Sequence, residues 1–167
     1  MPASSLAATL AETHGPAVRA YFRRATGRPE LADDLAQEVF LRVLRFADGF
    51  EARGRDRAWL FAIAHRVLVD HVRGGSRTQA SAGEATVDLA EPPTQKVRVL
   101  LQRALQALDT VDRHAFLLAE VAGLSYAEIA VVLDTSHAAV RSRVYRARLA
   151  LRTALTPSIG GAARSTP

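Results

Sequence analysis

The carboxyl-terminal part of the chain concentrates arginine on one predicted helix. From His137 to Arg152 the sequence HAAVRSRVYRARLALR holds five arginines, and no acidic residue follows Asp134. Guanidinium groups without carboxylate partners bind anions, and their geometry suits phosphates and the edges of bases. The pattern therefore predicts contact with a polyanion such as DNA, because carboxylates on the same surface would repel the phosphates.

Residues that could catalyse a reaction do not converge in this sequence. The five histidines are dispersed, and His65 and His71 are six residues apart, so they do not share one face of a helix. There is no cysteine, no glycine-rich phosphate loop and no nucleophile motif. We therefore expect a protein that is not an enzyme and that holds neither a metal ion nor another cofactor.

Composition agrees with a globular protein that meets a polyanion. The 167 residues carry a net charge of +5, which favours such a partner only weakly. No apolar run is long enough to span a membrane, and the N-terminus does not resemble a secretion signal. Together with the lack of cysteine, these features predict a cytoplasmic protein.

The helix breakers divide the chain into two sets of predicted helices. Strand-like alternation is absent, so we expect an all-α protein. His14-Gly15-Pro16 should interrupt the first helical stretch, and further helices should cover 29–46 and about 56–73. Residues 75–93 are small and polar, which predicts a flexible linker, since a loop of this length is rare inside one domain. The expected organisation is therefore one helical domain over 1–74, the linker over 75–93, a second helical domain over 94–156 and a disordered tail over 157–167.

The second domain carries the local signals of a helix-turn-helix. Asp109 can cap a helix, and Ser125 with Glu128 has the spacing of a capping box. The short turn 134–136 then separates a helix of about eight residues from the arginine-rich helix, as in helix-turn-helix proteins.

The arginine-rich helix is predicted to have one buried and one exposed face. The apolar residues that we expect to be buried are Val140, Val144, Ala147 and Leu151. The opposite face offers small or polar side chains flanked by arginine, which a major groove can admit. Its residues are Ala138, Ser142 and Tyr145, with Arg141 and Arg146 beside them. Arg143 lies near the buried edge, where we expect an ion pair with Glu128. A solvated basic helix without a DNA partner is the alternative.

Two segments together resemble a known family. LDTVDRHAFLLAEVAGLSYAEIAVVLDTSHAAVRSRVYRARLALR is similar to region 4 of the bacterial sigma factors, and LADDLAQEVFLRVLRFADGFEARGRDRAWLFAIAHRVLVDHVR is similar to region 2. The absence of other regions indicates the extracytoplasmic-function group. The resemblance implies a non-catalytic subunit that directs the RNA polymerase core to promoters. The second domain would read the minus-35 element, and the first would read and melt the minus-10 element.

The resemblance also implies partners and site residues. The partners would be the β′ clamp helices and the β flap of polymerase, promoter DNA and, in many members, an anti-sigma factor. In the family the helix matching 29–46 docks on the clamp helices, and an exposed leucine among polar groups suits such a protein partner. The polymerase-binding residues would be Asp34, Gln37, Glu38 and Leu41. A solvated acidic face is the alternative.

Further DNA contacts follow from the resemblance. Ser136 and His137 would join the minus-35 set at the start of the arginine-rich helix. Cations near the loop and along the next helix suit the phosphates of a separated strand. The minus-10 residues would be Arg53, Arg55, Arg57, His65, Arg66 and Arg73. The alternative for His65 is a surface histidine that has no role. Phe50 and Trp59 are expected in the core.

Some positions depart from the family pattern. Members often have asparagine at the position of Arg66, glycine at Asp134 and proline at Asp109. Their recognition helix usually opens with Pro-Gly-Thr, where this chain has His137-Ala138-Ala139. Aspartate tolerates the left-handed backbone at a helix end, so the turn can survive. A helix-turn-helix regulator that acts without joining polymerase remains the alternative function.

Overall fold

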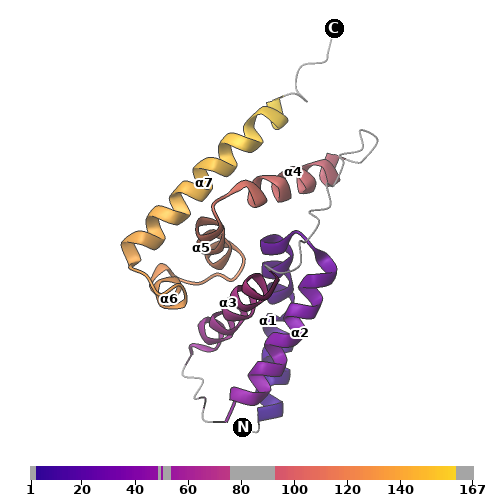
Figure 1. Cartoon of the computed structure of the whole chain (residues 1–167), viewed down its shortest axis with the longest axis vertical. Helices are drawn as coiled ribbons and strands as arrows, with labels where there is room; N and C mark the ends of the chain where they lie inside the picture. The colour runs from indigo at the N-terminus through magenta and orange to yellow at the C-terminus, as the bar shows by residue number, and fades with distance from the viewer. Residues whose placement is uncertain (1–2, 49, 51–53, 76–92, 161–167) are drawn as a thin grey trace.

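The computed structural model describes residues 3–48, 50, 54–75 and 93–160, which form seven helices without a strand (Figure 1). Most of the expected linker, residues 76–92, lies outside these ranges, as do residues 161–167 of the expected tail. The described helices form two bundles, one before and one after residues 76–92. The prediction of an all-α protein with two small helical domains is confirmed.

The first bundle consists of three helices around an aromatic and aliphatic core. Pro29 begins its second helix, where a missing N–H costs no hydrogen bond and the fixed φ suits the first turn. Gly27, with φ of 69°, closes the first helix. Core side chains with no exposed surface include Val18, Val39 and Leu60. The helices are α1 (Ala3–Thr26), α2 (Pro29–Phe46) and α3 (Asp56–Gly75).

The predicted break at His14-Gly15-Pro16 is wrong. Helix α1 runs through Pro16 without interruption. An interior proline removes one hydrogen bond and costs about 3 kcal/mol. Leu10 before it and Val18 after it are both buried on the same stripe, so burial on both sides of the proline favours a single helix axis.

The second bundle owes its turns to local hydrogen bonds. The Asp109 carboxylate accepts from the N–H groups of Val111 and Asp112 at 3.0 and 3.3 Å. Ser125 and Glu128 form the predicted capping box. The helices are α4 (Pro93–Ala107), α5 (Thr110–Glu120), α6 (Tyr126–Val132) and α7 (His137–Gly160). Helix α7 thus continues past the expected boundary at 156.

The turn between α6 and α7 has the predicted left-handed residue. Asp134 has φ of 50°, a left-handed conformation that glycine adopts most readily and that aspartate tolerates. The Ser136 hydroxyl accepts the N–H of Ala139 at 3.1 Å and so caps the start of α7. The helix-turn-helix is therefore formed by local chemistry despite the departures in sequence.

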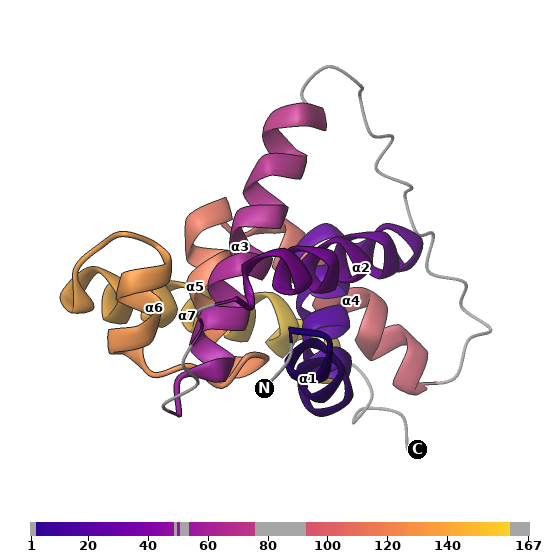
Figure 2. The same ribbon diagram turned by 90° about the horizontal axis from the view of Figure 1, so that it is seen from below.

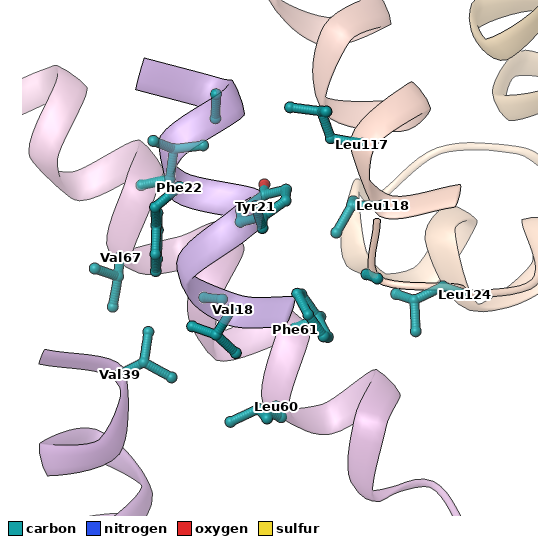
Figure 3. Close-up of a cluster of buried hydrophobic side chains, with 14 of the residues drawn as sticks. Val18, Tyr21, Phe22, Val39, Leu60, Phe61, Val67, Leu117, Leu118 and Leu124 are labelled. Atoms are coloured by element: carbon teal, nitrogen blue, oxygen red, sulfur yellow. The ribbon is translucent and has the colours of Figure 1, made fainter. Parts of the chain in front are cut away.

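The two bundles pack against each other in one continuous apolar core. Helices α1 and α3 contact helices of the second bundle, α1 against α4 and α5 and α3 against α6 (Figures 1 and 2). Figure 3 shows Tyr21 and Phe61 facing Leu117, Leu118 and Leu124 across this boundary. At one end, the side-chain amides of Gln102 and Gln106 donate to the carbonyl of Arg24 at 3.1 and 3.2 Å.

Candidate nucleic-acid interface

Helix α7 presents the two faces that its sequence predicts. Val140, Val144 and Ala147 have no exposed surface, and Leu151 is also buried. Ala138, Ser142 and Tyr145 are exposed, and Tyr145 keeps 66% of its surface in solvent. A structure with this outer face buried would have excluded groove binding. The exposed face leaves the predicted DNA contacts possible, and they stay predictions.

Side chains on the outer face of α7 enclose a shallow, open concavity. Its lining residues are Ala138, Arg141, Ser142, Tyr145 and Arg146, and we call this set the recognition face. The floor is small or polar and the arginines stand on its two sides, an arrangement that lets a duplex approach closely while guanidinium groups reach phosphates.

The first residues of α7 also build the turn that holds the helix. Besides the Ser136 cap, the His137 ring makes an edge contact with Tyr126 of α6, with ring centroids 5.9 Å apart. Ser136 and His137 are both exposed at the start of α7, next to the recognition face. Their predicted DNA contact is therefore combined with a part in the turn itself.

The expected ion pair between Arg143 and Glu128 is absent from the described residues. The Glu128 carboxylate instead accepts the Ser125 N–H at 2.8 Å, because the capping box uses it. The ion pair at this level joins Arg146 to Asp112, whose oxygens accept from Nε and Nη2 at 2.9 and 2.7 Å. These hydrogen bonds raise the pKa of Arg146. The partners are 34 residues apart in sequence, so no helical spacing could indicate the pair.

A second ion pair joins the same two helices farther along. Arg148 of α7 donates to Glu120 at the end of α5, and both side chains are largely exposed. Arg148 lies outside the recognition face. The two pairs tie α7 to α5 at both ends of the shorter helix.

The predicted minus-10 residues do not form one surface. Arg53 lies outside the described residues. Arg66 and Arg73 are exposed and share the outer face of α3, seven residues apart. Arg57 is directed to the second bundle, because its guanidinium lies within 3.4 Å of where a Cβ on Gly123 would be. Arg55 is exposed just before α3.

His65 faces the second bundle. Its Nδ1 lies 3.2 Å from the hydroxyl of Tyr21, and its ring makes an edge contact with the ring of His114, with centroids 5.1 Å apart. Burial lowers the pKa of His65 to about 4, so the ring is neutral near pH 7. With the bundles packed as they are, His65 is not a free surface histidine, because Tyr21 and His114 contact it. Its contact with DNA stays a prediction.

Phe50 and Trp59 form a stacked pair at the loop that precedes α3. Their ring centroids are 3.9 Å apart with an angle of 18° between the planes. Both side chains are half-buried, and Trp59 packs against the core, as predicted. The stack anchors the end of the loop on which the predicted strand-binding arginines lie.

The predicted polymerase-binding face lies along the outer side of α2. Asp34 and Gln37 are exposed, and Leu41 keeps 45% of its surface in solvent. Glu38 is half-buried and accepts from Arg42 at 2.8 Å. Sequence reasoning missed Arg42, which also reaches Asp70 of α3 at 2.9 Å, because that contact depends on tertiary packing.

One further apolar residue on α2 extends this face. Leu44 is one helical turn after Leu41 and keeps 42% of its surface exposed. Two neighbouring apolar side chains in solvent favour a protein partner over water. Phe46 is also exposed, at 60%, but it points to a different side of the helix.

Other kinds of site were sought in the part of the chain that the structure describes. There, no three histidine or carboxylate residues gather where they could hold a metal ion. None of the described helices has the length and apolar character needed to cross a membrane.

The capped turn and the exposed arginine-flanked helix define a helix-turn-helix protein, and comparison with known proteins identifies the family. Residues 10–78 match the model of sigma-70 region 2, and residues 98–151 match that of sigma-70 region 4. The chain is 39% identical to the probable RNA polymerase sigma-C factor of Mycobacterium bovis over 125 residues, covering 72% of this chain and 68% of that protein. It is 30% identical to the ECF RNA polymerase sigma-E factor of Escherichia coli over 142 residues, 75% of this chain and 74% of that one.

Solved structures agree with this assignment. The sigma factor RpoE from Bartonella quintana, in complex with the anti-sigma factor NepR, is similar with a TM-score of 0.70 and 29% identity over 84% of this chain and 91% of that one. CnrH in complex with the cytosolic domain of CnrY has a TM-score of 0.67 and 29% identity, over 93% and 95%. The chain belongs to the extracytoplasmic-function group of RNA polymerase sigma factors. As such it binds the polymerase core and directs promoter-specific initiation of transcription.

Proposed function

We propose that the chain divides the work of a sigma factor among three surfaces. The outer face of α2 docks on the β′ clamp helices, the recognition face of α7 reads the minus-35 element, and the arginines around α3 bind the separated minus-10 strand. The observation that carries this proposal is the recognition face itself, an exposed concavity flanked by arginine on the helix that follows the capped turn.

The positions of α2 and α7 are compatible with simultaneous binding. Helix α2 lies on the side of the first bundle that is turned away from α5 and α6, in both views of the molecule (Figures 1 and 2). A polymerase clamp seated on its outer face would therefore leave the recognition face open to DNA. The rival function, a regulator that never joins polymerase, gives no reason for exposed Leu41 and Leu44 on this face.

Contact with the minus-10 strand requires more of the molecule than contact with the minus-35 element. Arg55, Arg57, Arg66 and Arg73 are already exposed, although Arg57 lies beside Gly123, whereas His65 lies against the second bundle. We therefore infer that the bundles separate when the chain engages polymerase and a melted promoter. The chain would act in the cytoplasm, where polymerase transcribes.

An anti-sigma factor is a further expected partner. A solved relative of this chain was crystallised with such a protein, which supports the same kind of control here.

The direct test is reconstitution with purified core polymerase. The chain should co-elute with core from a sizing column and should start transcripts at new sites on a genomic library. Duplex binding without co-elution would instead support the regulator.

A pair of variants should separate the two surfaces. Asp34→Lys should weaken core binding at least tenfold and leave binding to upstream duplex unchanged, because a cation replaces an exposed carboxylate of the docking face. Arg141→Ala should do the reverse. Glu12→Lys makes the same charge change at an exposed site on α1 and should leave both activities unchanged. Equal core affinity for Asp34→Lys and the wild type would show that the α2 face is not the docking surface.

A further inference from the structure

One buried carboxylate in the second bundle contacts an arginine of the recognition face. Asp112 is the third residue of α5, and its side chain is only 11% exposed. A carboxylate in such a place is costly unless it is paired and hydrogen-bonded. Its two oxygens meet a single partner, Arg146, through the parallel hydrogen bonds described above.

The pairing holds the guanidinium in one orientation. Nε and Nη2 of Arg146 are both engaged, and a bidentate arginine–carboxylate pair fixes the plane of the group as well as its distance. Nη1 has no hydrogen-bond partner among the described residues. The arginine side chain is still 56% exposed and lines the concavity, so its free edge faces the space where DNA would lie.

Binding usually orders a flexible arginine side chain, and this ordering costs conformational entropy. A guanidinium already held at the edge of the concavity avoids much of that cost. Its place on the flank of α7, beside the small residues at the centre, corresponds to the wall of the major groove, where phosphates lie.

Resting on the function proposed above, we propose that Asp112 is a positioning residue for minus-35 recognition, which holds Arg146 so that its free Nη1 edge binds a phosphate oxygen of the duplex. Asp112 does not touch DNA in this account. It acts through Arg146, and the pair contributes affinity that does not depend on base sequence.

The chain contains a matched control for this role. Glu120 and Arg148 also join α5 to α7 through a carboxylate and a guanidinium. They differ in that Arg148 does not line the concavity, and in that Glu120 is 43% exposed where Asp112 is 11% exposed. A loss of packing between α7 and α5 would appear in the melting temperature of either variant, whereas a loss of phosphate binding would appear in the salt dependence of DNA affinity and belongs to Asp112 alone.

The test uses the full chain and a random-sequence duplex of about 30 base pairs, whose affinity is measured over a range of salt concentrations. Asp112→Asn should bind the duplex several-fold more weakly, and the slope of log affinity against log salt should fall in magnitude by up to about 0.9, the value for one lost phosphate contact. Arg146→Ala should show the same loss, and the double variant should be no weaker than Arg146→Ala. Glu120→Gln should leave both affinity and slope unchanged.

Thermal melting of each variant checks folding, and all affinities are compared well below the lowest melting temperature. The proposal is overturned if Asp112→Asn and Glu120→Gln have the same affinity and salt slope, or if Asp112→Asn binds more tightly because the carboxylate withholds Arg146 from DNA. A weaker Arg146→Ala beside an unchanged Asp112→Asn would reject the positioning role and leave the recognition face intact. If Arg141→Ala and Arg146→Ala both bind like the wild type, the recognition face itself is wrong.

Discussion

Three polar side chains meet in the apolar layer between the two bundles. Tyr21 has no exposed surface, and burial raises the pKa of its phenol. In the tautomer that leaves His65 Nδ1 unprotonated, the hydroxyl donates to that nitrogen. His114 packs against the far side of His65. The hydroxyl of Tyr21 thus satisfies a ring that apolar neighbours would otherwise leave without a partner.

Removing this hydroxyl should destabilise the folded chain. Tyr21→Phe keeps the ring and leaves the imidazole nitrogen unpaired, which should cost about 1 kcal/mol of unfolding free energy. Unfolding in urea measures this change in free energy. Tyr145→Phe removes a hydroxyl from an exposed ring and should change the unfolding free energy very little. Equal stability of Tyr21→Phe and the wild type would mean that the hydrogen bond contributes nothing.

At the scale of elements, α1 shows how tertiary packing overrides a local breaker. Pro16 is exposed inside the helix and leaves the carbonyl one turn earlier without its N–H partner. The helix continues because Leu10 and Val18, on either side of Pro16, are buried in the same core. The sequence contains both signals, and only their relative energies decide the outcome.

The position of each proline along its helix predicts opposite effects of replacing it. Pro16→Ala should restore the lost hydrogen bond and raise the unfolding free energy, by less than the roughly 3 kcal/mol that an interior proline costs, because alanine also gives the unfolded chain more freedom. Pro29→Ala replaces a proline at the first turn, where it is favourable, and should be neutral or slightly destabilising. Denaturant unfolding distinguishes the two. No gain for Pro16→Ala would indicate that the helix is broken in solution.

At the scale of the whole molecule, the packing of the bundles depends on neutral histidines. Burial lowers the pKa of His65 to about 4, and burial together with His65 and Arg113 lowers that of His114 to about 3, although Asp109 opposes the shift. Tyr21 is the other titratable group at this contact. Protonation of either ring would place a charge in the layer between the bundles, where its partner ring is close.

The closed arrangement should therefore weaken in acid. Both histidines bind protons more readily when exposed, with an ordinary pKa near 6.5, than when packed. Their contribution is complete above about pH 6.5 and is lost progressively as the pH falls from there to the lowered values. At pH 5 the loss should be on the order of 2 kcal/mol for each histidine relative to neutral pH. Urea unfolding at the two pH values measures stability, and small-angle scattering detects separation of the bundles.

The matched variant replaces both rings with a side chain that does not titrate. The double substitution His65→Gln and His114→Gln should remove most of the dependence on pH between 5 and 7.5, whatever its effect on stability at neutral pH. If the double variant keeps the wild-type dependence, other groups control it and the histidine contact is not the acid-sensitive element.

The sequence by itself determined the features that depend on neighbours within a few residues. Helical spacing predicted the buried side of α7 at Val140 and Val144, and side-chain caps predicted the start of α6 at Ser125. It also predicted the exposure of Tyr145, since a residue's direction on a helix follows from its number. These are local relations, and the small, polar composition of residues 75–93 added to them the division into two domains.

Tertiary structure alone decided the relations between distant residues. The pairing of Asp112 with Arg146, the contact of Arg42 with Asp70 and the burial of His65 against His114 all join elements far apart in sequence. The course of α1 through Pro16 was decided in the same way. Periodicity says which way a side chain points and not which other helix it will meet, because that depends on the sum of many packing contacts over the whole core.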